Sequence, residues 1–342
     1  LAIAPNSTHT TISNGNNSIA IGVNLRADGS KAIGIGADTN VTGISAIAIG
    51  NNDSGRMANQ GVNGNGAIGV GSNLTVRGNN AIAVGTESQA KANDTVAVGT
   101  GAQATLANSI AIGKNSVATG MYGTAALGRA TAIGFNTQAL GEDSVAIGSG
   151  VDANAAALAQ NRQSVALGWS AKATGTTQAV AIGPDAQASG AQSTSIGNNT
   201  RATGDSSIAI GGDDWDDAKK SVNTQYKKLT GSDMSSGYQG TTAATAAVAV
   251  GVKAQATGAL STAFGPGAIA SGLGASAFGV GASATQDKSV AIGAGSTTTI
   301  NAEKITTATV NGITYGGFAG TNNLTHGSQV SFGTAGYERQ LK

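Results

Sequence analysis

The chain has 342 residues, of which 40% are hydrophobic, 4% aromatic and 11% charged. With 53 glycines and few bulky side chains it cannot fill the core of one compact globule, and the absence of cysteine excludes disulfide frameworks and thiolate metal sites. The formal net charge is +1 and no basic stripe with interleaved aromatics occurs, so nucleic-acid binding is not expected. No run of about 18 apolar residues is present that would span a membrane.

A short phrase recurs along the chain, most often at a step of 14 residues. It reads Ser-Val-Ala-Ile-Gly at 144–148, where alternating β-branched residues predict a strand and the glycine a bend. A second strand is predicted where alanines alternate with Gln or Lys, as in Ala102–Ala104. Two short strands and two turns fill about 14 residues, so stacked copies predict an all-β parallel β-solenoid.

Side-chain alternation assigns a face to each position of the predicted coil. The central alanine of the first strand, such as Ala146, is expected inside a thin coil, and its aliphatic neighbours are expected outside. The stacked aliphatic pairs form a stripe larger than the apolar patches that soluble monomers usually expose. We therefore expect an obligate homo-oligomer, with periodicity alone leaving two and three subunits open. The residues assigned to its interface are Ile110, Ile112, Val145, Ile147, Val165, Leu167, Val180 and Ile182.

An insertion is predicted at 212–247, where the step between phrases widens to 40 residues. Its segment DDWDDAKKSVNTQYKKL places acidic residues before lysines, an order that complements a helix dipole and favours a short helix. The insertion either packs on the coils or a neighbouring subunit, or it protrudes and contacts a receptor. Candidate partner-binding residues are Trp215, Lys219, Lys220, Tyr226, Lys227, Lys228 and Tyr238, together with Gln103, Lys172, Gln187 and Gln255 on the outer face of the second strands.

The phrase Asn-Ser-Ile-Ala-Ile-Gly, present at 17–22 and again at 108–113, resembles the head repeat of trimeric autotransporter adhesins of the Yersinia adhesin type. The resemblance covers most of 15–300, which leaves 1–14 as a cap or leader. At the other end, 301–342 is assigned as a β-prism-like segment followed by the start of a neck, because SQVSFG and GYERQL resemble the opening of necks in this family.

The resemblance implies a left-handed β-roll, three chains to a head, and display outside the cell on the surface of a Gram-negative bacterium. Anchoring to the outer membrane is then expected from C-terminal regions absent from this sequence. The implied function is non-enzymatic attachment to host extracellular-matrix proteins such as collagen, fibronectin or laminin, or to a host-cell receptor. Bacterial self-association, and a structural spacer that displays a binding site located elsewhere, remain alternatives.

Motifs for chemistry are weak. A G-x-G-x-x-G pattern at 64–69 lies within the repeat and lacks the strand-then-helix setting of a nucleotide loop, and the acidic cluster at 213–217 lacks EF-hand spacing. The two histidines, His9 and His326, lie at opposite ends of the chain. Trimeric hexapeptide-repeat acyltransferases have a period of six, which does not divide 14, and no register of outward threonines suits ice binding. We expect no catalytic residue, no cofactor and no metal.

Overall fold

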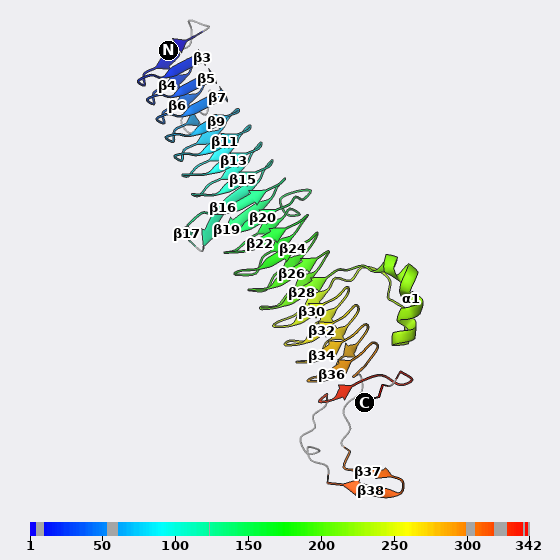
Figure 1. Cartoon of the computed structure of the whole chain (residues 1–342). Coiled ribbons are helices and arrows are strands. Elements are labelled where there is room, and N and C mark those ends of the chain that lie inside the picture. Colours follow the sequence, from blue (N-terminus) through cyan, green and yellow to red (C-terminus); the bar gives the residue numbers. More distant parts are fainter. Residues whose placement is uncertain are drawn as a thin grey trace. The chain divides into compact units, whose positions relative to one another are not determined.

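The computed structural model describes residues 1–4, 10–52, 61–122, 124–298, 305–317, 327–337 and 339–340. Within these ranges the chain is an all-β parallel solenoid with a single helix, which confirms the predicted fold class (Figure 1). It divides into two units, residues 1–185 and 186–342. His9 and His326 lie outside the described residues, as do residues 53–60.

In the first unit, two parallel sheets stack one rung per coil. The first strands of the coils are β1 (Ala2–Ile3), β3 (Ile19–Val23), β5 (Ile33–Ala37), β7 (Ile47–Asn51), β9 (Ile68–Val70), β11 (Ile82–Val84), β13 (Val96–Val98), β15 (Ile110–Ile112), β18 (Thr131–Ile133), β20 (Val145–Ile147), β22 (Val165–Leu167) and β24 (Val180–Ile182). The second strands are β2 (Ile12–Ser13), β4 (Arg26–Ala27), β6 (Asn40–Val41), β8 (Gly61–Val62), β10 (Thr75–Val76), β12 (Gln89–Ala90), β14 (Gln103–Ala104), β16 (Val117–Tyr122), β19 (Gln138–Gly141), β21 (Leu158–Ala159) and β23 (Lys172–Ala173). A short antiparallel partner of β16, β17 (Ala125–Ala126), leaves this stack.

The second unit repeats the arrangement. Its first strands are β26 (Thr194–Gly197), β28 (Ile208–Gly211), β30 (Val248–Val250), β32 (Thr262–Phe264), β34 (Ser276–Phe278), β36 (Val290–Ile292) and β39 (Val330–Ser331). Its second strands are β25 (Gln187–Ala188), β27 (Arg201–Ala202), β29 (Thr242–Ala243), β31 (Gln255–Ala256), β33 (Ile269–Ala270) and β35 (Ser283–Ala284). The unit also holds α1 (Asp216–Thr230) and an antiparallel hairpin of β37 (Thr307–Val310) and β38 (Ile313–Gly316).

The core is built almost entirely from alanine. The central alanines of the first strands, such as Ala146 and Ala166, are fully buried, as are the alanines that close the second strands, such as Ala173. Serines at the end of a turn, immediately before a strand, are also buried, as at Ser109 and Ser116, and Ser116 satisfies its hydroxyl by donating to the carbonyl of Gly113 at 2.9 Å. The predicted inward positions are therefore confirmed, while most second strands are shorter than expected because two residues suffice between the turns.

The glycine that ends each phrase is required by the stacking of the coils. Gly113 has φ +125°, and a Cβ there would lie 2.4 Å from the carbonyl oxygen of Gly134 in the next coil. Any side chain at this position would push two rungs apart, so the bend and the close approach both demand glycine.

The core changes composition in the N-terminal coils. Leu25 and Val41 are fully buried there, and Gly34 occupies the central position that Ala20 and Ala48 fill in the adjoining rungs. The larger residues fill the space that an alanine side chain would need.

Replacing Gly34 by Ala is expected to destabilise these coils by about 1–3 kcal/mol, the usual cost of overpacking. The added Cβ would lie 2.6 Å from Cδ2 of Leu25 and 3.3 Å from Cγ2 of Val41. Thermal unfolding followed by circular dichroism measures the effect. The double variant Gly34→Ala/Leu25→Val is the control, because the shorter neighbour restores the space. A single variant as stable as the parent protein would show that this core tolerates added volume.

Candidate binding surfaces

The predicted aliphatic stripe is present on the outer face of the first-strand sheet in the first unit. The eight residues assigned to the interface occupy the first and third positions of β15, β20, β22 and β24, and none of them is buried. Register places Val165 between Val145 and Val180, and Leu167 between Ile147 and Ile182. Ile112 is 38% exposed and Ile147 is 41% exposed, so the described part of the chain leaves these stripe positions uncovered.

The second unit carries larger residues on the corresponding face of its coils. Phe264 of β32 and Phe278 of β34 are adjacent in register and are 54% and 41% exposed. Ile292 of β36 follows them in the next rung. An apolar outer face is therefore a property of both units, and its residues become bulkier after the insertion.

Outward side chains of the second strands are less available than the sequence suggests. Gln187 is exposed and Gln103 is half-buried. Lys172 donates through Nζ to the carbonyl of Ala156 at 2.6 Å, and burial lowers the pKa of this amine. Gln255 donates through Nε2 to the carbonyl of Gly240 at 2.7 Å. Two of the four predicted partner-binding residues in this row therefore hold loops against the coils.

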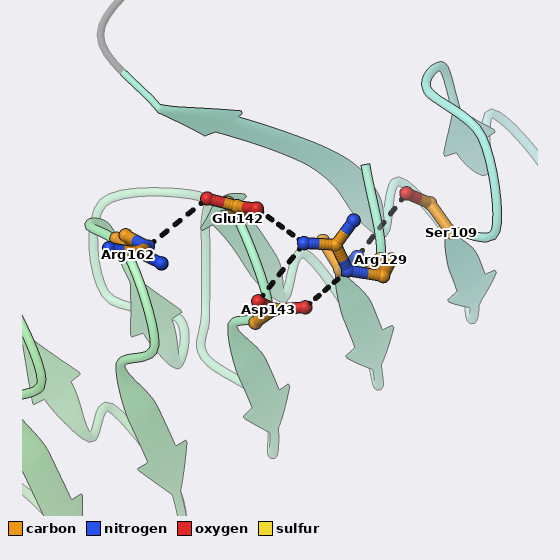
Figure 2. A network of polar contacts seen from close by, with 6 residues as sticks. Ser109, Arg129, Glu142, Asp143 and Arg162 are labelled. Carbon is orange, nitrogen blue, oxygen red and sulfur yellow. Dashed lines mark hydrogen bonds and ion pairs between the residues drawn. The ribbon is translucent and has the colours of Figure 1, made fainter. Parts of the chain in front are cut away.

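A charged network crosses three coils of the first unit, just after the β16–β17 hairpin (Figure 2). Arg129, at φ +61°, pairs with Glu142 and with Asp143, whose Oδ1 lies 2.6 Å from the Arg129 Nε. The Glu142 side chain is only 6% exposed and also lies 3.1 Å from Nε of Arg162. The hydrogen bond from Arg129 lowers the pKa of Asp143, so this ion pair weakens as the pH falls through that lowered value.

The sequence reasoning missed this network. We call the turn after the first strand of a coil its first turn, and the turn that leads from the second strand to the next coil its second turn. The signal for the network was a series of charged residues in the second turns of consecutive coils, at Arg129, Glu142, Asp143 and Arg162. In the Asn-Ser-Ile-Ala-Ile-Gly phrase at 108–113, Asn108 occupies the corresponding position of this turn. The charges gather just after the β16–β17 hairpin interrupts the regular stack, and they tie together the three coils that follow it.

The insertion is shorter than expected. Its last residues belong to the solenoid, because β29 pairs with β27 and β31, and Ala243 and Ala247 are fully buried. The Thr241 hydroxyl oxygen lies 2.7 Å from the carbonyl oxygen of Gly251 and 2.9 Å from that of Gly212, within hydrogen-bond distance of both. The chain therefore leaves the coils after Gly212 and rejoins them at Thr241, and only 213–240 lies outside the stack.

The predicted helix is confirmed as α1. Asp216 and Asp217 lie in its first turn and Lys227 and Lys228 in its last, as the helix dipole favours. Gly231 ends the helix with φ +78° and donates its backbone N–H to the carbonyl of Lys227, a left-handed C-cap that glycine adopts without strain. No residue of α1 is buried, so the helix lies on the surface.

Trp215, immediately before the helix, anchors the insertion to the coils. Trp215 is 7% exposed, and its Nε1 donates to the carbonyl of Ser235 at 2.5 Å. The Tyr226 ring meets it edge-on with centroids 5.7 Å apart, and Nζ of Lys253 lies 5.1 Å from the centre of the indole ring. Lys253, itself 3% exposed, also donates to the carbonyl of Gly237. Trp215 and Tyr226 therefore contact the protein's own coils.

The surface beneath α1 is made of turn glycines spaced by 14 residues. A Cβ at Gly267 would lie 2.6 Å from Cη2 of Trp215, one at Gly281 would lie 2.9 Å from the Tyr226 hydroxyl, and one at Gly295 would lie 2.6 Å from Cα of Thr230. Most other coils place a polar residue in the same left-handed turn position, namely Asn24, Asp38, Asn73, Glu87, Asn115, Asn136, Ser170, Asp185, Asn199 and Lys253. Glycine at this position in three consecutive coils is the sequence signal for a docked segment. The sequence analysis did not recognise this signal.

The exposed part of the insertion faces away from this contact. Tyr238 is 77% exposed, and Lys220, Lys227 and Lys228 are exposed as well. Lys227 pairs with Asp233 at 2.9 Å, which lowers the pKa of that carboxyl group. Lys219 is half-buried and donates to Ser236 at 2.6 Å. Of the seven candidates in the insertion, Tyr238 and the exposed lysines are the ones placed to meet a partner.

The weak chemical motifs gain no support. The G-x-G-x-x-G pattern runs from a turn into β9, and the chain continues into another coil instead of a helix. Across the described residues no group of three or more His, Asp or Glu side chains is arranged to hold a metal ion. The helix α1, the one helix in the described part of the chain, is too short and polar to cross a membrane.

Replacing Gly281 by Asn is expected to loosen α1 without straining the turn, because asparagine tolerates the left-handed conformation while its side chain would displace Tyr226. Limited trypsin digestion should then cleave the lysines of α1 several-fold faster. The matched control is Gly274→Asn, since Gly274 has φ +63° and no atom within 4 Å of its would-be Cβ. Equal cleavage of both variants and the parent would show that α1 does not depend on this contact.

The family model described as "YadA head domain repeat (2 copies)" matches segments of the chain that together cover more than half of it. The matched residues are 9–24, 27–52, 77–102, 107–126, 128–150, 159–186, 177–200, 188–213, 243–268 and 270–296. The matches pause between 213 and 243, where the insertion leaves the coils. No curated protein matches the chain. With the stacked coils, their alanine core and their exposed stripe, these matches show that the chain belongs to the YadA head family, the β-roll heads of trimeric autotransporter adhesins.

Proposed function

We propose that this head attaches a bacterium to host extracellular-matrix proteins such as collagen, fibronectin or laminin, or to a host-cell receptor. The observation that carries the proposal is the insertion 213–240, which is fixed on the coils by Trp215 and presents Tyr238 and several lysines to solvent. Tyrosine is a favoured contact residue, and a fixed segment loses little entropy on binding. A trimer carries three copies, so modest sites combine into strong attachment.

The trimer that this function needs is proposed to form through the aliphatic stripe. In the described coils of the first unit the stripe is exposed and continuous in register at the third strand position, and each of these coils except that of β18, where Thr131 takes the first position, contributes two aliphatic residues to it. Placing it on the three-fold axis removes the largest exposed apolar surface from water. Outer-membrane anchoring through further C-terminal regions completes the proposal.

Replacing Ile112 by Asp is expected to weaken the trimer by at least about 2 kcal/mol per chain, because an unpaired carboxylate would be buried on the axis. Sedimentation velocity and thermal unfolding measure the change. Gln103→Asp is the matched control, since Gln103 lies on the second strand of the preceding rung and points outward. An Ile112→Asp protein that remains trimeric with the parent's melting temperature would remove the stripe from the interface.

Excising 214–238 and joining Asp213 to Gln239 through a short glycine turn is expected to abolish binding while leaving the coils intact. The backbone N–H of Gln239 already donates to the carbonyl of Asp213 at 2.9 Å, so the two ends are adjacent. Binding of the trimer to immobilised collagen, fibronectin and laminin, and adhesion of displaying bacteria to host cells, measure the loss. The expected decrease is about 10²-fold or more, the scale of multivalent binding.

The control for this experiment is Gln187→Ala, an exposed residue of the second-strand row outside the insertion. Binding retained after the excision would move the site to the coils. A head that binds none of the three proteins and gives no adhesion to host cells would overturn the proposed function, and cell-to-cell clumping of the displaying bacteria in that case would identify self-association.

A further inference from the structure

An open apolar groove of about 310 Å³ lies between α1 and one edge of the second unit. This edge, the first-turn edge, is formed by the turns that follow the first strands. On the helix side, Val222 and Leu229 are seven positions apart on one helix face and are 42% and 50% exposed. On the coil side, a row of apolar turn residues repeats at the 14-residue step. The groove is lined chiefly by Trp215, Val222, Leu229, Val252, Pro266 and Val280.

This groove is continuous with the apolar outer face of the coils. Pro266 follows Phe264 by two residues, and Val280 follows Phe278 in the same way. Phe264 and Phe278 lie on the apolar outer face of the second unit, and both are substantially exposed. Within the second unit, apolar surface therefore runs from the outer face around the edge of the coil and into the groove.

Two exposed leucines lie on the opposite edge of these same coils. Packing within a single chain does not account for their exposure. Leu260 is 66% exposed and Leu273 is 48% exposed, both in second turns. Leu260 also adopts φ +58°, a left-handed conformation that disfavours a bulky side chain. Many other coils place a polar residue at the position of Leu260, namely Asn17, Lys31, Ser45, Asn80, Asp94, Asn108, Gln163, Gln192, Ser206 and Lys288. Burial of this exposed leucine against another apolar surface would offset the cost of placing it in a strained turn.

The leucines and the groove lie at the same height in the stack. Leu260 and Pro266 flank β32, and Leu273 and Val280 flank β34. The two turns of a coil are at opposite edges of its sheets. If the apolar outer face of these second-unit coils lies on a three-fold axis, the second-turn edge of each subunit meets the first-turn edge of the next, and such head-to-tail contacts close into a ring.

We propose that Leu260 and Leu273 of one subunit insert into the groove between α1 and the turn row of the next subunit. The occupant is thus a second copy of this chain, and the insertion becomes part of the trimer contact. The inference rests on the proposed placement of the stripe on the axis. One side of the insertion then holds the neighbouring subunit, while Tyr238 and the exposed lysines are left for a host partner.

Cysteine cross-linking tests the contact, because the natural chain contains no cysteine. The double variant Val222→Cys/Leu260→Cys is expected to give covalent trimers as the main species on denaturing gels after mild oxidation, and Leu229→Cys/Leu273→Cys is expected to do the same. The four single variants should give none. The matched control is Thr224→Cys/Leu260→Cys, since Thr224 lies on the far face of α1 and should not cross-link.

An Ile112→Cys variant reports separately on the axis, where oxidation should give disulfide-linked dimers. Cross-linking at Ile112 with none in either groove pair, in proteins with unchanged circular dichroism, would overturn the inference and leave the trimer standing. Equal cross-linking through Thr224 and Val222 would also overturn it, because the contact would then lack specificity. No cross-linking at Ile112 together with a monomer in sedimentation would overturn the trimer placement itself.

Discussion

The thinness of the coil is the constraint on which the rest of the molecule depends. The two sheets approach so closely that alanine fills the space between them at almost every rung, and a larger residue such as Leu25 enters only where Gly34 gives up its side chain. Because the inside accepts only small groups, the β-branched residues that stabilise the strands must point outward. The apolar surface needed for assembly is thus a direct result of having so little room inside.

The surface beneath the insertion differs from the turns of the other coils. Elsewhere the turns carry polar side chains that stack from coil to coil, as Asn24 does when it donates to Asp38 at 2.6 Å. Under α1 those side chains are absent, and Gly267, Gly281 and Gly295 expose backbone on which aromatic rings and the helix can rest. A chain poor in aromatics uses Trp215 to fix this segment, with the buried Lys253 beside the indole ring. The contribution of Trp215 is therefore to hold the insertion rigidly on the coils.

Much of this could be predicted from the sequence, because a period of two within a strand and of 14 along the chain fixes which residues face inward. Ala111, Ala146 and the helix α1 follow from such local rules. The end of the insertion did not, since the Thr242–Ala243 strand lacks the Gln or Lys of its counterparts. The Arg129 network and the docking of Trp215 depend on which turns become neighbours in space, and a phrase read one unit at a time does not reveal that.

The docking of α1 also addresses a weakness of repetition. Coils with nearly the same sequence are interchangeable, so a stack can slip by one rung and still bury its alanines and satisfy its backbone. Trp215, Tyr226 and Thr230 fit only over Gly267, Gly281 and Gly295, which come later in the chain than the helix itself. A slipped stack would bring a side chain such as that of Lys253 under the helix where a glycine belongs. The insertion therefore distinguishes one rung from the next and fixes the register in which the coils of the second unit stack.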